Sequence, residues 1–100
     1  MIKIKYTHAF KDDLTKLLTD EPNLKNDIDK VVSWFVNNPQ DTRLGLHVLK
    51  KRLKGKNAIE ITEDIRIIFE WLGKTVARFL AIGPHYNVYP GYKKSSKEKV

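Results

Sequence analysis

The sequence contains no cysteine and only three histidines, His8, His47 and His85. The absence of cysteine excludes disulfides and thiolate metal sites. The histidines lie far apart in the sequence and no two of them are spaced as a helical ligand pair, so we expect neither a metal site nor a cofactor. Glycine-rich phosphate loops, dinucleotide-binding motifs and G-x-S-x-G nucleophile motifs are also missing, which argues against the enzyme classes that these motifs mark.

Long apolar stretches are missing as well. Apolar runs such as residues 67–69 are far too short to cross a bilayer. The first five residues alternate between apolar and basic and so lack the apolar centre of a signal peptide. Together with the lack of cysteine, these features predict a cytoplasmic protein that does not enter a membrane.

Basic residues outnumber acidic ones by 19 to 12, which gives a net charge of +7 on a chain of 100 residues. This bias favours nucleic acid, the ribosome, an acidic protein or an anionic membrane surface as the partner. A chain of this length forms one small domain and leaves much of its surface exposed. We therefore expect a shallow site that depends on a large substrate or partner.

The N-terminal half reads as one strand followed by two helices. Residues 2–6 alternate apolar and basic, which is typical of a half-buried strand. Thr7 is suited to cap a helix, and apolar residues then recur at helical spacing to residue 18. A second helix is expected to start near Pro22, within its first turn. The apolar periodicity continues to residue 36, and the Asn38-Pro39 pair stops the helix.

The C-terminal half reads as strands. Residues 40–57 form a basic connection with a short extended piece over 46–49, and strands are expected at 58–62, 65–71 and 75–82, with a tight turn at 72–74. The predicted fold is α+β with the order β-α-α-β-β-β. Its mostly antiparallel sheet carries the two-helix hairpin on one face. Residues 1–91 are predicted to form the single domain, and residues 92–100 a basic, flexible tail.

Two arginines are expected on the sheet face that the helices leave free. Asp64 and Arg66 are two residues apart in the expected strand, so they share a face. That face is opposite the apolar residues at 65, 67, 69 and 71, which we expect to pack on the helices. Arg78 lies on the next strand. The residues expected on the face of Arg78 are Val76, Leu80 and Ile82.

His85 and Tyr89 follow the last expected strand. Together with the arginines they suit the cleavage of a phosphodiester bond in RNA. Histidine can act as an acid or a base near neutral pH. Arginine stabilises the charge that builds on the phosphate. Tyrosine can stack on a base or donate a proton. The basic connection and the last expected strand add candidate RNA-binding residues, namely Lys50, Lys51, Lys54, Lys56 and Arg78.

Residues 44–89 resemble the RelE/ParE toxin superfamily, in its plasmid-stabilisation and mRNA-interferase branch. Three motifs carry the resemblance: H-x-L-x-x-x-L-K-G at 47–55, D-x-R-I-I-[FY] at 64–69, and I-G-x-H-x-x-V-Y at 82–89. The resemblance implies the toxin of a type II toxin–antitoxin system that cleaves mRNA on the ribosome. Members of the superfamily divide between mRNA cleavage and inhibition of DNA gyrase, so a ParE-like gyrase inhibitor without nuclease activity is the alternative.

The resemblance also implies roles for single residues. His85 matches the general acid of the interferase branch, Tyr89 its closing aromatic residue, and Arg66 its phosphate-binding arginine. Three residues remain candidates for the general base. These are His47, which matches the histidine of the first motif, Asp64, which matches the acidic residue of the second, and Glu60, where one relative has a histidine.

The implied partners are a cognate antitoxin, the ribosome and mRNA. The antitoxins of such toxins have a disordered and often acidic segment that wraps the toxin, and a basic chain with an exposed sheet suits that segment. A toxin–antitoxin hetero-oligomer is expected. The basic connection departs from the family in one respect, because Lys50 stands where glycine is common. This departure adds charge to the connection.

Overall fold

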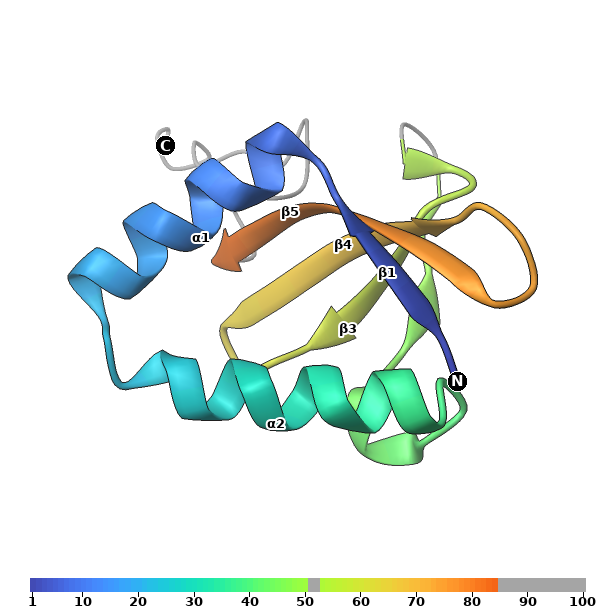
Figure 1. Ribbon diagram of the computed structural model, residues 1–100, viewed down its shortest axis with the longest axis horizontal. Helices are drawn as coiled ribbons and strands as arrows, with labels where there is room; N and C mark the ends of the chain where they lie inside the picture. The colour runs from blue at the N-terminus through green and yellow to red at the C-terminus, as the bar shows by residue number, and fades with distance from the viewer. Residues whose placement is uncertain (51–52, 85–100) are drawn as a thin grey trace.

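In the computed structural model, two helices pack on one face of a five-stranded sheet (Figure 1). Residues 1–50 and 53–84 are described. The elements in chain order are β1 (Lys3–Tyr6), α1 (His8–Asp20), α2 (Leu24–Asn37), the short 3-10 helix η1 (Thr42–Leu44), β2 (His47–Val48), β3 (Asn57–Glu60), β4 (Ile65–Trp71) and β5 (Val76–Pro84). The predicted tail at 92–100 and residues 85–91 lie outside the described residues.

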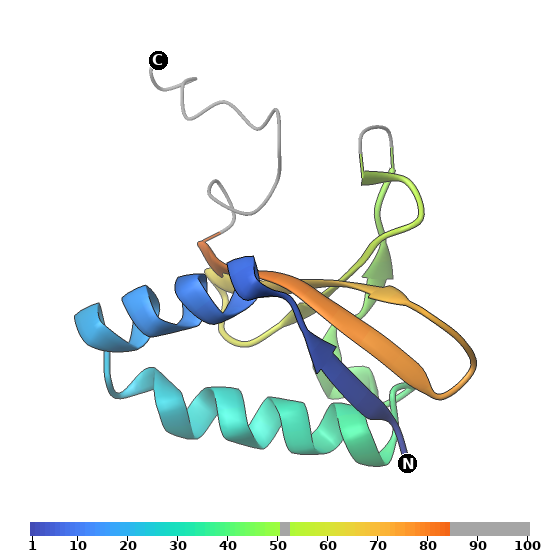
Figure 2. The same ribbon diagram turned by 45° about the horizontal axis from the view of Figure 1, so that its top comes forward.

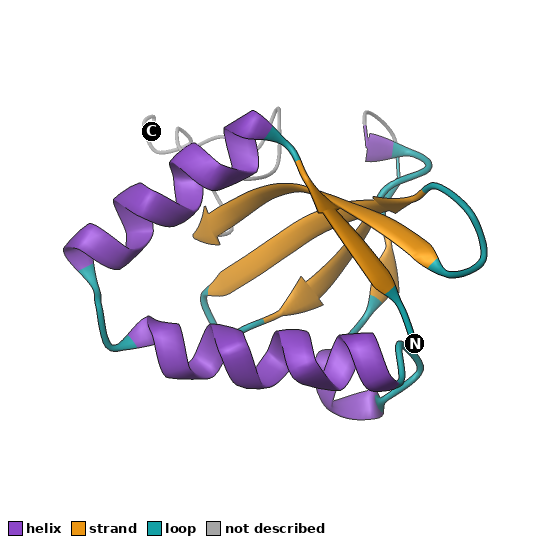
Figure 3. Cartoon of the chain, in the orientation of Figure 1, coloured by secondary structure: helices purple, strands orange, loops and turns teal. Residues whose placement is uncertain are grey.

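The strands are ordered β1-β5-β4-β3-β2 across the sheet. β1 runs parallel to β5, and every other neighbouring pair is antiparallel. The predicted α+β class, the mostly antiparallel sheet and the helical hairpin on one face are confirmed (Figures 2 and 3). The extended piece expected near residues 46–49 forms β2, so the sheet has five strands where about four were expected.

Both helices begin close to their predicted positions. Thr7 caps α1, because its hydroxyl oxygen accepts a hydrogen bond from the backbone N–H of Phe10 at 3.0 Å. The second helix was expected to include Pro22 in its first turn, but α2 begins at Leu24 with Asn23 as its N-cap. Pro22 lies just before the cap, where its carbonyl oxygen accepts from the N–H of Lys25 at 3.2 Å.

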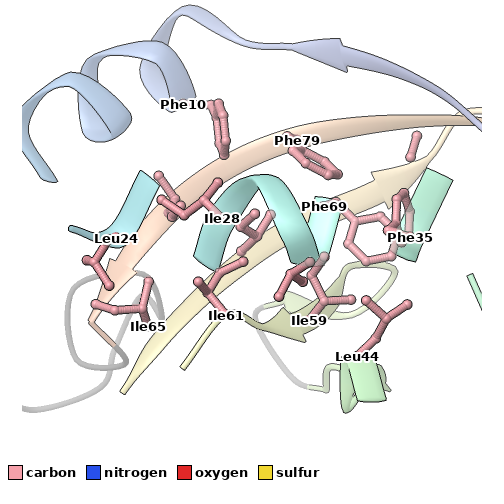
Figure 4. Packing of buried hydrophobic residues seen from close by; sticks show 14 of the residues in the cluster. Phe10, Leu24, Ile28, Phe35, Leu44, Ile59, Ile61, Ile65, Phe69 and Phe79 are labelled. Atoms are coloured by element: carbon pink, nitrogen blue, oxygen red, sulfur yellow. The ribbon is translucent and has the colours of Figure 1, made fainter. Parts of the chain in front are cut away.

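Aromatic residues from both helices fill the space over the sheet. Phe35 of α2 is fully buried, and its ring centroid lies 5.0 Å from that of Phe69 on β4 and 5.7 Å from that of Phe79 on β5. Phe10 of α1 packs on Phe79 at 5.4 Å, and Figure 4 shows these rings directed toward one another. Such contacts add directional packing to the burial of apolar area, so this cluster sets how the hairpin sits on the sheet.

Alternation along β4 separates its two faces. Ile65, Ile67 and Phe69 are buried in the core on the helical side. The residues between them, Arg66, Ile68 and Glu70, therefore point to the other face, which we call the second face. Ile68 joins a small apolar cluster there, whose other members are Ala58, Leu49, Leu80 and Ala81. The predicted direction of Arg66 is therefore confirmed.

A bulge in β5 changes the expected face of one residue. Opposite β4, Phe69 pairs with Phe79 and Ile68 pairs with Ala81, so Leu80 is an extra residue in β5. Both Leu80 and Ala81 contact the second-face cluster. Ile82 was expected on the face of Arg78, but it belongs to the helical-side core because the extra residue shifts the alternation.

β5 extends beyond the end of β1, so the backbone groups on this edge have no strand partner there among the described residues. Thr7 and α1 supply hydrogen-bond partners for them. The hydroxyl of Thr7 donates to the carbonyl oxygen of Leu80 at 3.3 Å. The carboxylate of Asp13 accepts from the N–H of Ile82 at 3.4 Å. Pro84, two residues further on, has no N–H to satisfy. This part of the strand therefore keeps few unpaired backbone groups.

Replacement of Phe35 by alanine should lower the free energy of unfolding by about 3–5 kcal/mol, because a fully buried ring is lost from the aromatic cluster. Val48→Ala is the control, since Val48 is 66% exposed, and it should change the stability by less than about 0.5 kcal/mol. Urea denaturation followed by circular dichroism measures both. Equal stability losses in the two variants would contradict the central place of Phe35 in the core.

Candidate functional site

Three rows of residues cross the second face of the sheet, each with one residue from each of four neighbouring chain segments. The Arg66 row consists of Gly45, Glu60, Arg66 and Gly83. The Ile68 row consists of His47, Ala58, Ile68 and Ala81. The Glu70 row consists of Leu49, Lys56, Glu70 and Arg78. Neighbouring rows are two residues apart along the strands, or about 7 Å.

Arg66 is held by the bend that joins β3 to β4. Its Nη1 donates to the carbonyl oxygen of Thr62 at 3.1 Å and to that of Glu63 at 2.8 Å. Only 16% of the side chain is exposed. Its Nε is buried and has no hydrogen-bond partner among the described residues. An unsatisfied buried donor costs about 1–3 kcal/mol, so the guanidinium is positioned but retains an unused donor.

Glu60 lies beside Arg66 on the neighbouring strand. The two residues are Cα partners in the β3–β4 ladder, and Glu60 Oε2 is 3.9 Å from Arg66 Nη2. This distance allows charge attraction but is too long for a hydrogen bond. The side chain of Glu60 is 44% exposed, so it lies between the guanidinium and solvent.

Gly45 provides the space for Glu60. A Cβ atom on Gly45 would lie 2.8 Å from Cδ of Glu60, closer than real Cβ atoms come. Its φ of +57° is in the left-handed region that glycine adopts without strain. Gly45 follows η1, where Leu44 is fully buried and the Arg43 guanidinium lies 3.9 Å from the ring of Trp34. The position of the glycine is therefore set by the packing of η1 on α2.

His47 lies on the second face, one row from Arg66. Its neighbour Leu46 packs on the helical-side core, and its Cα partner is Ala58. The Nδ1 atom of His47 is 3.0 Å from the carbonyl oxygen of Gly45. A carbonyl oxygen only accepts, so in the neutral imidazole this contact puts the proton on Nδ1 and leaves the lone pair of Nε2 free.

Asp64 does not share a strand face with Arg66 as expected. It lies in the bend before β4, which begins at Ile65. The hydroxyl oxygen of Thr62 accepts from the N–H groups of Asp64 and Ile65, at 3.2 and 3.1 Å, and so closes the bend before the strand starts. Among the described residues the acidic partner of Arg66 is Glu60.

The Glu70 row brings together two of the predicted RNA-binding residues. Glu70 accepts hydrogen bonds from Nε of Arg78, at 2.8 Å, and from its Nη2. Its other oxygen is 3.4 Å from Nζ of Lys56. Hydrogen bonding to Arg78, with a smaller contribution from Lys56, lowers the pKa of the Glu70 carboxyl below its ordinary value. Arg78 therefore lies two rows from Arg66 and does not join it.

The remaining predicted residues divide between exposed positions and positions outside the described residues. Lys50 and Lys54 are exposed in the connection between β2 and β3. Lys51, His85 and Tyr89 lie outside the described residues. In the described part of the chain no three potential ligands form a metal-binding group, and neither α1 nor α2 is long and apolar enough to span a membrane.

Sequence reasoning missed Gly45, Thr62 and Glu70. A glycine two residues before His47 was a weak signal, because many glycines lie in loops without any contact. A hairpin closed at residues 72–74 brings Glu70 opposite Arg78, so the register of that turn was the signal that could have found the ion pair.

An apolar hollow of about 510 Å³ lies on the other side of the molecule, away from these rows. Tyr6, Phe10, Leu14 and Val32 are among the residues that line it. None of the predicted site residues that the structure describes lines the hollow.

The fold is that of RelE/ParE-type toxins, as comparison with solved structures shows. YafQ of E. coli is 22% identical and covers 89% of this chain and 99% of its own, with a TM-score of 0.73. It also matches in the E. coli DinJ–YafQ toxin–antitoxin complex, with 21% identity, 88% and 97% coverage and a TM-score of 0.72.

Two further structures share the fold. A metal-bound toxin from Helicobacter pylori is 22% identical, with 89% and 100% coverage and a TM-score of 0.73. A YoeB/ParE toxin from Agrobacterium tumefaciens is 17% identical, with 85% and 100% coverage and a TM-score of 0.72. No family model matches the sequence, and a search of curated proteins finds no match. The predicted resemblance is therefore confirmed in the fold.

Gly45→Ala should lower the free energy of unfolding by about 1–3 kcal/mol, through the left-handed backbone and the clash with Glu60. Adding Glu60→Ala should restore part of the loss, because the clashing carboxylate is then absent. A double-mutant cycle by urea denaturation measures this coupling, which should reach at least about 0.5 kcal/mol. Gly55→Ala is the control: Gly55 also has a positive φ, but a Cβ atom added there would meet no atom within 4 Å, so this variant should show no coupling to Glu60.

The pH dependence of stability should report the Glu70 ion pairs. A carboxyl whose pKa is lowered by folding stabilises the folded state above its unfolded pKa, and this contribution is lost as the pH falls through the folded value. The stability difference between wild type and Glu70→Gln should thus be constant above about pH 5 and shrink below the ordinary value of 4.5. Urea midpoints from pH 3 to 7 measure it, and a constant difference throughout would contradict the shift.

Proposed function

We propose that this chain is the toxin of a type II toxin–antitoxin system and that it cleaves mRNA on the ribosome. The observation that carries the proposal is the Arg66 row. A basic side chain is held there by backbone carbonyls, beside Glu60 and one row from His47, and its Nε has no hydrogen-bond partner in the part of the chain that the structure describes. This arrangement suits a phosphate. The fold shared with YafQ and YoeB/ParE toxins and the net charge of +7 support the same function.

The proposed reaction uses the 2′-hydroxyl of the RNA as the nucleophile. A base takes the proton of this hydroxyl, and the bond from O2′ to phosphorus forms. The bond from phosphorus to the 5′-oxygen of the next nucleotide breaks, and an acid protonates that oxygen. Arg66 stabilises the additional negative charge on the phosphate oxygens in the transition state. The reaction needs no metal and no cofactor.

We assign the general base to His47. The contact of Nδ1 with the carbonyl oxygen of Gly45 supports this role, because Nε2 is then the free acceptor. Glu60 faces the guanidinium of Arg66, so its carboxylate is better suited to orient the arginine. Asp64, the third candidate, is exposed in the bend before β4.

We assign the general acid to His85 and base stacking to Tyr89, as the resemblance implies. Both residues lie outside the described residues. In the sequence His85 comes directly after Pro84, and the Cα partner of Pro84 in the sheet is Ile65, the neighbour of Arg66. This proximity in the chain supports a role for His85 at the Arg66 row. The proposed RNA-binding residues are Lys50, Lys51, Lys54, Lys56 and Arg78.

The proposed partners follow from this function. A cognate antitoxin would hold the toxin in a hetero-oligomer, as DinJ does in the complex with YafQ. The ribosome would present the mRNA, which compensates for a shallow site. Action on the ribosome implies that the protein works in the cytoplasm.

The test is a reconstituted translation reaction with primer extension of the mRNA. Wild type should produce discrete cuts, and His85→Ala, His47→Ala and Arg66→Gln should each reduce cleavage by about a hundredfold or more. His8→Ala is the matched control, because the side chain of His8 is 91% exposed on α1, where its Nε2 lies 3.5 Å from the carboxylate of Asp12. It should cut like wild type.

The nuclease assignment is wrong if wild type produces no cuts or if the His85 and His47 variants retain full activity. A DNA gyrase supercoiling assay on the same protein tests the alternative. Inhibition of gyrase without mRNA cleavage would identify the protein as a ParE-like toxin instead.

A further inference from the structure

We propose that Lys56 and Arg78, arranged by Glu70, form a second contact site for an RNA phosphate, at the other end of the second face from Arg66. This inference rests on the proposed function and extends it, because it names a specific path for the RNA across the sheet. It also gives Glu70 a role, namely to limit how tightly the RNA is held.

Three neighbouring segments bring these charges together. Glu70 is on β4, Arg78 is its Cα partner on β5, and Lys56 directly precedes β3 on the other side. Both cations contact the same carboxylate, one at each oxygen. The cluster therefore carries one net positive charge, and it fixes two basic side chains in place on one surface.

The two cations keep capacity for another acceptor. Arg78 uses Nε and Nη2 for Glu70, so further N–H donors of its guanidinium remain. The side chains of Arg78 and Lys56 are 45% and 34% exposed, whereas that of Glu70 is only 19% exposed. A phosphate can therefore approach the cations from solvent, with the carboxylate beneath them.

The surface between Arg66 and the Glu70 row suits a single strand of RNA. The rows are four residues apart along β4, or about 13 Å. Between them lies the Ile68 row, where Ala58 and Ile68 are buried and the partly exposed side chains of Leu80 and Ala81 pack against them. Apolar side chains accept the faces of unstacked bases, and basic groups at either end contact the backbone. The second face thus has a phosphate contact at each end of an apolar floor.

Glu70 sets the strength of this contact. Its negative charge opposes an incoming phosphate while it orients both cations. Removal of a unit charge about 4 Å away in water corresponds to about a fivefold change in affinity. Glu70→Gln should thus bind RNA about fivefold more tightly. If Glu70 served only to hold the two cations in place, the loss of its ion pairs would not strengthen RNA binding.

The experiment measures binding of a ten-nucleotide RNA whose 2′-hydroxyls are methylated, so that it cannot be cleaved. Fluorescence anisotropy of the full chain is recorded from 50 to 200 mM KCl. Arg78→Gln and Lys56→Gln should each weaken binding roughly tenfold. Each should reduce the slope of log K against log salt by about 0.7, the value for one phosphate contact on a single strand.

Lys16→Gln is the matched control. Lys16 is exposed on α1, on the helical side of the sheet, and its loss removes the same unit charge. It should leave the slope unchanged. Thermal unfolding by circular dichroism shows that each variant is folded, and an oligoglutamate peptide of equal charge replaces the RNA in a parallel titration.

The outcomes separate this site from the proposed function. The site is wrong if wild type binds no RNA, if the Arg78 and Lys56 variants behave like Lys16→Gln, or if they lose affinity only for oligoglutamate. It is also wrong if wild type cuts mRNA while Arg78→Gln binds RNA unchanged, although the nuclease then stands. If the binding pattern is as expected but wild type cuts no mRNA, the phosphate site stands and the nuclease fails.

Discussion

The packing of the helical hairpin on β4 and β5 is the interaction on which the other features of the molecule depend. Phe35 contacts Phe69 and Phe79 at once, and Phe10 contacts Phe79 from the other helix. Burial of these rings commits one face of both strands to the core. Because side chains alternate along a strand, the same burial sends Arg66 and Glu70 to the second face. The candidate chemistry is thus a consequence of hydrophobic packing on the opposite side.

The two arginines of the second face have different hydrogen-bond partners. The guanidinium of Arg66 rests on backbone carbonyls of Thr62 and Glu63, and Glu60 faces it from a longer distance. Arg78 has instead a direct carboxylate partner in Glu70. The two arginines therefore differ in their surroundings: Nε of Arg66 has no hydrogen-bond partner among the described residues, whereas Arg78 shares its charge with a fixed acid.

The resemblance in the sequence and the comparison with solved structures point to the same fold. The motifs lie between residues 47 and 89, whereas the structural match covers 89% of the chain. The fold alone does not specify an activity, because function resides in sites rather than in folds. The proposal of phosphodiester chemistry therefore rests on the geometry around Arg66 and His47, and the proposal of the ribosome as partner rests on the net positive charge.

The sequence by itself determined the class of fold, because alternation and helical spacing report directly which face of each element is buried. Thr7 as a helix cap, the direction of Arg66 and the short strand at 47–48 were all predictable from local patterns. The tertiary structure decided what local patterns do not encode. The hydroxyl of Thr62 closes a bend that removes Asp64 from the strand, the extra residue Leu80 turns Ile82 to the core, and Gly45 leaves room for Glu60. Each of these results depends on contacts between residues far apart in sequence or on a break in regular alternation, so only the folded chain shows which charges meet.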